Sequence, residues 1–264
     1  MAKNVSIFAA LLLVLVLGLP GCRGGSNSPD GIPAPAGSAS GAVTGGSAPS
    51  DGVGSTVCPD PQPSTLFRNQ RGEGTFYDVS GPGSCSFPLD NDHMIAAINS
   101  PQYQHGAACG ACLKVRGPQG EVVVRVVDRC PECRSGDLDL SEVAFSQIAD
   151  PSLGRVDIAW DEVPCPIEDP VRYYFKPGSS QWWVAVQVRN HRNRVARFDV
   201  LDNDGRYREL PRVDYNYFVA SEGLGSGPLT FRITDLFGHS IEDGSIVLQP
   251  GQSVVSQGQF PLCH

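Results

Sequence analysis

The sequence predicts an all-β protein with two small domains that follow an N-terminal export segment. Its 264 residues include 30 Gly and 22 Pro, which favours many turns and argues against a helical bundle. Short runs rich in β-branched and aromatic residues recur between these turn signals from Gly74 to Leu248. Only Ser141–Ile148 has a clear helical pattern, while His93–Asn99 suits either a strand or a helix.

The first 22 residues predict an export signal. Lys3 supplies a positive start, and Ile7–Leu17 is an apolar run too short to cross a bilayer stably. The segment ends in Leu19-Pro20-Gly21-Cys22, which resembles the lipobox of bacterial lipoproteins and makes Cys22 the lipidated first residue of the mature chain. Pro20 is unusual in that motif, so simple cleavage and full secretion is the alternative. We therefore expect a bacterial protein that is extracellular, or a cell-surface lipoprotein attached to the membrane through Cys22.

Residues 23–57 predict a disordered tether. The segment contains only Gly, Ser, Ala, Pro, Thr, Val, Ile, Asn, Asp and one Arg, and without an aromatic residue it cannot form a core. A flexible coil of about 35 residues has an r.m.s. reach of roughly 30–35 Å, enough to hold a domain away from a membrane. A leader without a function of its own is equally compatible with this composition.

Residues 58–166 predict a compact β-barrel. Their strand-like runs are short and broken by Gly and Pro, and only one clear helix accompanies them, which favours a barrel over a βαβ sheet. The expected strands are Gly74–Asp78, His93–Ile98, Cys112–Arg116, Glu121–Asp128 and Val156–Val163.

Residues 167–264 predict a β-sandwich, because short strands recur there without helices. The boundary falls near residues 164–170 with hardly any linker, so we expect the two domains to pack closely. The expected strands are Val171–Phe175, Trp182–Asn190, Ala196–Leu201, Tyr217–Ala220, Leu229–Thr234 and Ser245–Leu248.

The charge distribution excludes some classes of partner. The formal net charge is −8, and no basic patch stands out, so nucleic acid is not an expected partner. Most of the negative charge lies in residues 66–166, which would repel polyanionic polysaccharides.

Eight cysteines remain besides Cys22. Cys109-Gly-Ala-Cys112 and Cys130-Pro-Glu-Cys133 lie 17 residues apart, a spacing that fits a four-cysteine zinc site. The export signal favours disulfides instead, because thiols oxidise outside the cytoplasm. Four further cysteines also need partners, namely Cys58, Cys85, Cys165 and Cys263. We expect disulfides, no metal and no other cofactor.

The stretch from Val126 to Ser141 carries the candidate chemistry. Alternation in 121–128 predicts a half-buried strand in which Asp128 shares a face with Val126. Asp139 alternates with two leucines and faces away from them, and Ser141 then suits the N-cap of the short helix. A carboxylate at a strand end beside a cleft suits acid catalysis on a sugar. Equally, such an aspartate can cap a loop by accepting backbone N–H groups.

The chain resembles the bacterial expansins from about Gly72 to His264. The residues that carry the resemblance are Gly74-Thr75-Phe76-Tyr77, Val127-Asp128-Arg129-Cys130-Pro131, Leu138-Asp139-Leu140-Ser141, the block SSQWWVAVQVRNH from Ser179 to His191, and the block VDYNYFV from Val213 to Val219. The resemblance implies a six-stranded double-psi β-barrel followed by an immunoglobulin-like β-sandwich that binds cellulose.

The resemblance also implies site residues in the barrel. The polysaccharide groove would hold Thr75, Asp128 and Asp139, with Asp139 aligned to the general acid of related cellulose-cleaving barrels. Cys130 stands where bacterial members often have a tyrosine, so a bulky sugar contact is lost and a Cys130–Cys133 bridge would fix the turn instead. Cysteine-bearing relatives imply the pairs Cys112–Cys165 and Cys85–Cys109. Cys58 and Cys263 then remain as a possible bridge.

A second implied surface lies in the sandwich. Strict alternation along the Trp182–Asn190 strand predicts that Trp183 is exposed and Trp182 lies in the core. The resemblance implies instead that both tryptophans form a flat row with Tyr215, on which glucose rings stack, with Lys176 as a flanking polar contact. We follow the resemblance, because a strand that begins just after Gly178-Ser179-Ser180 can twist enough to expose both rings.

Three functions follow from these expectations. The first is a monomeric, non-enzymatic protein that binds cellulose or a related β-glucan and loosens it without hydrolysis. The second is a lytic enzyme that cleaves cellulose or peptidoglycan, with Asp139 as the acid and Asp128 as the base. The third is a purely adhesive carbohydrate-binding surface module in which the groove is idle.

Overall fold

The computed structural model describes Cys58, residues 66–88 and residues 93–263. The expected export signal, the lipidated Cys22 and the tether of residues 23–57 lie outside the described residues. Within the described residues, none of the helices has both the length and the apolar character that a bilayer crossing requires.

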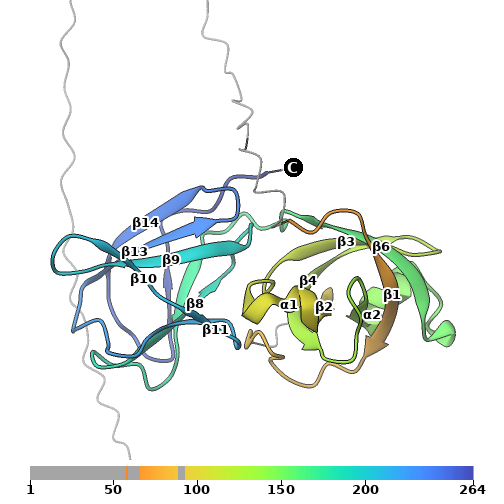
Figure 1. Ribbon diagram of the computed structural model, residues 1–264, viewed down its shortest axis with the longest axis horizontal. Coiled ribbons are helices and arrows are strands. Elements are labelled where there is room, and N and C mark those ends of the chain that lie inside the picture. The colour runs from red at the N-terminus through yellow and green to blue at the C-terminus, as the bar shows by residue number, and fades with distance from the viewer. Residues whose placement is uncertain (1–57, 59–65, 89–92, 264) are drawn as a thin grey trace, which may run out of the picture. The chain divides into compact units, whose positions relative to one another are not determined.

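Six strands form a closed barrel in the order β1-β5-β2-β4-β3-β6 (Figure 1). β1 pairs in parallel with β5, and β2 pairs in parallel with β4, while the other pairs are antiparallel. The strands are β1 (Gln70–Tyr77), β2 (Ile95–Asn99), β3 (Cys112–Arg116), β4 (Glu121–Cys130), β5 (Leu138–Ser141) and β6 (Val156–Val163). The helices are α1 (Ser100–Tyr103), η1 (Gln104–Gly106), α2 (Glu142–Ile148) and η2 (Pro151–Leu153).

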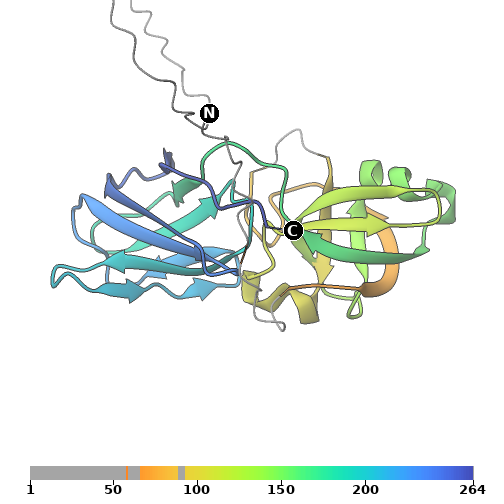
Figure 2. The ribbon, with the colours of Figure 1, turned by 90° about the horizontal axis from the view of Figure 1, so that it is seen from above.

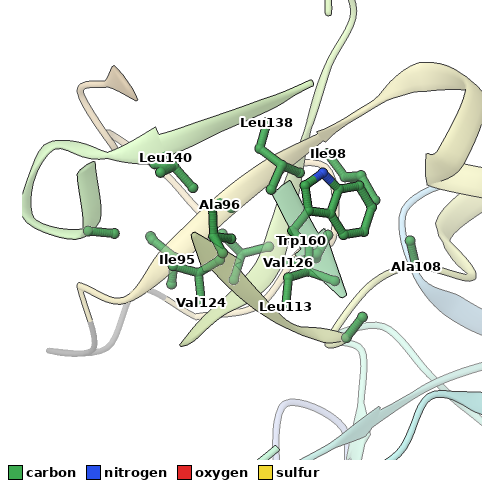
Figure 3. Close-up of a cluster of buried hydrophobic side chains, with 14 of the residues drawn as sticks. Ile95, Ala96, Ile98, Ala108, Leu113, Val124, Val126, Leu138, Leu140 and Trp160 are labelled. Atoms are coloured by element: carbon green, nitrogen blue, oxygen red, sulfur yellow. The ribbon is translucent and has the colours of Figure 1, made fainter. Parts of the chain in front are cut away.

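Alternating apolar residues of these strands fill the barrel. Leu138 and Leu140 are fully buried, as the alternation around Asp139 predicts. Figure 3 shows them with other side chains of this core, and there the indole of Trp160 lies beside Leu138, Ile98 and Val126. The indole nitrogen donates to the carbonyl of Gly136 at 2.7 Å, so the one polar atom of this buried ring is satisfied.

Two expectations for local structure have clear outcomes. Ser141 caps α2 as predicted, because its hydroxyl accepts the N–H of Ala144 at 3.1 Å. The helical alternative for His93–Asn99 is wrong, because residues 95–99 form the buried strand β2 between β4 and β5. Asn99 then caps the separate helix α1 by accepting the N–H of Gln102 at 3.0 Å.

The predicted face of Asp128 is also wrong. In the pairing of β2 with β4, Val126 lies opposite Ala96 but Asp128 lies opposite Ala97, so Val127 is an extra residue at a β-bulge. Neighbouring residues of β2 point to opposite faces. Val126 is therefore in the core while Asp128 points to the outer face.

Nine strands form two sheets that enclose a second core. A four-stranded sheet has the order β10-β9-β13-β14, and a five-stranded sheet has the order β11-β12-β8-β7-β15. They are the teal to blue strands of Figures 1 and 2. Their bounds are β7 (Arg172–Phe175), β8 (Val184–Arg189), β9 (Val195–Leu201), β10 (Tyr207–Glu209), β11 (Arg212–Val213), β12 (Tyr217–Ala220), β13 (Leu229–Asp235), β14 (Ser240–Ile246) and β15 (Ser253–Val255).

Three of these strands, β10, β11 and β15, were not expected from the sequence. Each has only two or three residues and lies at a sheet edge, where one side is solvated and the apolar alternation is lost. The last predicted strand, Ser245–Leu248, is wrong in its bounds, because β14 begins at Ser240 and ends at Ile246.

Strand β8 is buried on both faces. Its valines lie in the sandwich core, whereas Gln187 on the other face is fully buried against the barrel. The Gln187 amide donates to the carbonyl of Cys85 at 2.8 Å, and the Asn216 amide donates to the same carbonyl at 3.3 Å. Tyr103 adds a hydrogen bond from its hydroxyl to the carbonyl of Asp214. The barrel and the sandwich are thus joined by buried polar contacts.

Four disulfides join cysteines of the part of the chain that the structure describes: Cys58–Cys263, Cys85–Cys109, Cys112–Cys165 and Cys130–Cys133. These are the pairs expected from the resemblance and from the remaining cysteines. Cysteines 109, 112, 130 and 133 belong to three different bridges, so the four-cysteine zinc alternative is wrong.

Candidate functional site

Four strands of the barrel place Thr75, Asp139, Ala97 and Asp128 in one row. Thr75 of β1 pairs with Asp139 of β5, Asp139 pairs with Ala97 of β2, and Ala97 pairs with Asp128 of β4. Strand neighbours lie about 4.8 Å apart, so two spacings separate the Cα atoms of the aspartates by about 10 Å. The structure therefore brings together the three groove residues expected from the sequence.

Asp139 is the half-buried carboxyl of this row that contacts Thr75. The Thr75 hydroxyl donates to its Oδ1 at 2.6 Å. Burial raises the pKa of Asp139, opposed by the hydrogen bond from Thr75, while the charges of Glu132 and Asp128 raise it and that of Arg155 lowers it. The carboxyl thus keeps its proton at a higher pH than a solvent-exposed aspartate. In its protonated form this carboxyl can donate a hydrogen bond or a proton to a sugar oxygen.

Asp128 has a different role, because it holds the loop of residues 81–86. Its Oδ1 accepts the N–H of Ser84 at 2.6 Å and the N–H of Arg129 at 2.7 Å. Gly83 lies directly over it with φ +60°, and a Cβ at Gly83 would come within 2.9 Å of the Asp128 side chain. The capping interpretation therefore describes Asp128, and the acid interpretation suits Asp139.

A hollow of about 450 Å³ surrounds Thr75 and Asp139. Two of its other carboxylates are engaged: Asp137 accepts the N–H groups of Glu73 and Arg134, and Glu73 pairs with Arg155 at 2.5 Å. The Cys130–Cys133 bridge forms part of the wall. Cys130 is the residue that stands in place of the tyrosine discussed above. The full lining is Glu73, Thr75, Phe76, Cys130, Glu132, Cys133, Arg134, Asp137, Asp139 and Arg155.

Tyr77 is a groove residue that the sequence reasoning missed. It lies two positions after Thr75 on β1, so its side chain leaves the strand on the same face. Its hydroxyl is buried and has no hydrogen-bond partner among the described residues. Burial raises the pKa of Tyr77, and the charges of Asp128 and Asp139 raise it further. The period of two along Thr75–Tyr77 was the signal that could have identified it.

The residues of the expected aromatic surface lie just before two strands of one sheet: the two tryptophans precede β8 and Tyr215 precedes β12. Trp182 is 73% exposed and Tyr215 is 40% exposed, while Trp183 is half-buried. The alternation-based prediction that Trp182 lies in the core is wrong. Trp182 precedes the strand, in a turn closed by reciprocal backbone hydrogen bonds between Ser180 and Trp183 at 2.7 and 3.2 Å.

Lys176 and Tyr215 lie together on the same sheet. The Lys176 ammonium is 5.7 Å from the ring centre of Tyr215 and 5.1 Å from that of Tyr217, which suits cation–π contacts. The Lys176 N–H donates to Ala185 of β8, and β12, which follows Tyr215, pairs with β8. The tryptophans and Tyr215 therefore come from segments that border neighbouring strands.

Metal binding has little support in the described residues. Cys58, Cys263 and His239 lie within 4.8 Å of one another. The two sulfurs form a disulfide, however, and a disulfide lacks the thiolate that binds a metal.

Comparisons with known proteins place these features in a family. Residues 95–160 match a family model described as lytic transglycolase. The chain is 37% identical over 193 residues to Expansin-YoaJ of Bacillus subtilis (strain 168), covering 70% of this chain and 82% of that protein. It is 31% identical over 199 residues to Expansin-like protein 3 of Dictyostelium discoideum, covering 70% of this chain and 59% of that protein.

Solved structures agree with this family. The crystal structure of the apo expansin of Clavibacter michiganensis has a TM-score of 0.70 and 35% identity, and the match covers 75% of this chain and 100% of that one. An aspartate-to-asparagine variant of that expansin, in complex with cellohexaose, has the same TM-score at 34% identity and the same coverage. With its double-psi β-barrel followed by a β-sandwich, the chain belongs to the expansin family.

Proposed function

We propose that the protein binds cellulose or a related β-glucan and loosens it without hydrolysis. The observation that carries this proposal is the half-buried Asp139, whose carboxyl accepts a hydrogen bond from Thr75 and has a raised pKa, beside an Asp128 whose carboxylate holds a loop. A carboxyl group and a threonine hydroxyl can replace the hydrogen bonds that a glucan chain makes with its neighbours. The cellohexaose complex of the Clavibacter relative supports this class of ligand.

Hydrolysis by inversion needs a second carboxylate about 6.5–9.5 Å from the acid to activate a water molecule. The distance between Asp128 and Asp139 in the row would by itself permit Asp128 to be that base. Its two backbone hydrogen bonds instead orient the carboxylate toward its loop. Among the described groove residues, Glu132 is the remaining carboxylate without an ion pair or a hydrogen bond from the backbone, and it lies on an exposed turn.

The sandwich supplies the affinity in this proposal. Pyranose rings present faces of C–H groups, and stacking them on Trp182, Trp183 and Tyr215 removes apolar area from water on both sides. Lys176 stands beside Tyr215 and can donate to a ring hydroxyl. Because stacking is not ionic, binding to cellulose should depend weakly on salt.

Measurements on one set of samples test the loosening activity. Wall extension under constant load should be present with the wild type and lost with Asp139→Ala, while binding to cellulose stays unchanged. The same samples should release no reducing ends from amorphous cellulose. Extension that persists in Asp139→Ala would favour the adhesive function, in which the groove is idle.

A lytic enzyme is the second candidate, favoured by the lytic transglycolase description of the model that matches residues 95–160. Cellulose and peptidoglycan incubated side by side with the protein should then yield soluble fragments. If such fragments appear and Asp139→Asn or Glu132→Gln abolishes them, the non-hydrolytic proposal is wrong.

Export, anchoring and domain limits complete the proposal. We assign the protein to the cell exterior as a monomer, anchored through lipidated Cys22 and the tether or fully secreted. The disulfides support an oxidising location. Metabolic labelling with a fatty acid, lost in Cys22→Ala, tests the anchor.

Domain limits of 58–166 and 167–264 are supported by the end of β6 at Val163 and the start of β7 at Arg172.

A further inference from the structure

Trp182 is exposed on a turn that has few contacts of its own. Its N–H reaches the Ser180 hydroxyl at 3.3 Å, and the turn closes through the backbone of Ser180 and Trp183. A side chain that is 73% exposed adds little packing to hold the turn. The orientation of the indole therefore depends on what lies behind the backbone of residues 181 and 182.

Gly223 lies directly behind that backbone. A Cβ built on Gly223 would be 2.0 Å from the carbonyl oxygen of Gln181 and 2.6 Å from both Cα and C of Trp182. Real Cβ atoms essentially never come closer than 3.0 Å to another atom, so any side chain here must displace the turn. The backbone of Gly223 also has φ +76°, which a glycine adopts without penalty.

The rest of the loop fixes Gly223 in this position. The Gly223 N–H donates to Ala220 at the end of β12, and the Gly225 N–H donates to the carbonyl of Gln181, both at 3.1 Å. Between them, Leu224 packs against the sandwich core. The segment from Ala220 to Gly225, here called the support loop, thus holds the Trp182 turn from behind and is itself anchored in the core.

We propose that Gly223 is a positioning residue for glucan binding: it lets the support loop press against the Gln181–Trp182 peptide and so sets the plane of the Trp182 indole. The inference rests on the proposed function, because it takes Trp182 to be a stacking residue. Gly223 itself touches no sugar. Its effect is on the angle at which the ring meets the polymer, since stacking requires the ring face to lie flat on the pyranose.

The test is Gly223→Ala compared with Gly205→Ala. Gly205 has φ +73° in the exposed turn after β9, and nothing lies within 4 Å of a Cβ built there. Both variants therefore carry the same backbone penalty for alanine, but only Gly223→Ala meets the Trp182 turn. Binding to microcrystalline cellulose, thermal unfolding and tryptophan emission are measured for both, with Trp182→Ala as the reference for loss of the ring.

We expect both glycine variants to lose melting temperature, and Gly223→Ala to lose more, because its Cβ must also displace the turn. Only Gly223→Ala should weaken cellulose binding, by roughly tenfold and so toward the level of Trp182→Ala, because a displaced ring forfeits about one aromatic contact. Its emission and its quenching by iodide should also change relative to wild type. These changes should vanish when both proteins carry Trp182→Phe, which leaves Trp160 and Trp183 as the emitters.

Full cellulose affinity in a folded Gly223→Ala variant, with Trp182→Ala clearly weakened, would overturn the positioning role and leave the proposed function intact. Full affinity in Trp182→Ala would instead refute the stacking role on which the inference rests. If Gly223→Ala does not fold, Leu224→Ala replaces it, because it removes the anchor of the support loop without touching the turn. Leu224→Ala should show the emission change expected for Gly223→Ala, with a smaller loss of cellulose affinity. If its emission and its affinity both match wild type, the positioning role is again overturned.

Discussion

Acidification should destabilise the fold through His191. This side chain is 5% exposed and lies against Gly110 of the barrel, where a Cβ would come within 2.5 Å of the imidazole. Its Nδ1 contacts the carbonyl of Asn193 at 2.9 Å. Burial lowers the pKa of His191 to about 4, opposed by the bond to Asn193 and reinforced by the charges of Arg212, Arg125 and Arg194.

The magnitude follows from proton linkage. An unfolded histidine has a pKa of about 6.5, so between pH 6.5 and 4 the unfolded chain binds a proton that the folded protein excludes. The free energy of unfolding therefore falls as pH falls through this window. At pH 4.5 the difference from pH 7 is about 2.5 kcal/mol for this residue alone.

Urea unfolding at pH 7 and pH 4.5 measures this effect, with His191→Gln as the comparison. The variant is expected to be less stable at pH 7, since the pocket is shaped for an imidazole. Its loss of unfolding free energy on acidification should be smaller than that of wild type by about 2.5 kcal/mol. Equal losses in the two proteins would refute the assignment of this pH dependence to His191. Asp139→Asn serves as a control, because a raised carboxyl pKa acts in the opposite direction.

Three further predictions concern the groove, the aromatic surface and the disulfides. Thr75→Val removes a hydrogen bond that lowers the pKa of Asp139, so the carboxyl should titrate at higher pH in carbon-detected NMR, and an unchanged or lower titration would contradict the contact. Trp182→Ala combined with Tyr215→Ala should weaken cellulose binding by roughly 10- to 100-fold, while Val247→Ala, which trims another exposed apolar side chain, should not. Replacing both cysteines of Cys58–Cys263, which spans 205 residues, by serine should lower the unfolding free energy by about 5 kcal/mol, against about 1.5 kcal/mol for Cys130–Cys133, which spans 3. Equal losses in denaturant titrations would show that loop closure does not govern these bridges.

Strands with strong apolar alternation, such as β3 and β6, were predictable from the sequence. The helix cap at Ser141 was predictable as well, from the preference for serine at that position. The face of Asp128 was not, because it depends on a bulge that arises only when β4 pairs with Ala96 and Ala97. Alternation also failed for Trp182, because β8 begins at Val184 and hydrogen bonds of Ser180 determine the preceding turn. The disulfide pairs came from the resemblance, since eight cysteines alone allow many pairings.

The carbonyl of Cys85 connects the segment that carries Tyr215 to the groove row of the barrel. Asn216, the neighbour of Tyr215, donates to it, and the adjoining Ser84 N–H is held by Asp128 in the groove row. If the proposed function holds, tension on a polymer bound to the aromatic rings would reach the groove through these hydrogen bonds. A glucan chain bound at both places would then be held at a fixed length, against which thermal motion of the surrounding fibril could separate it from its neighbours.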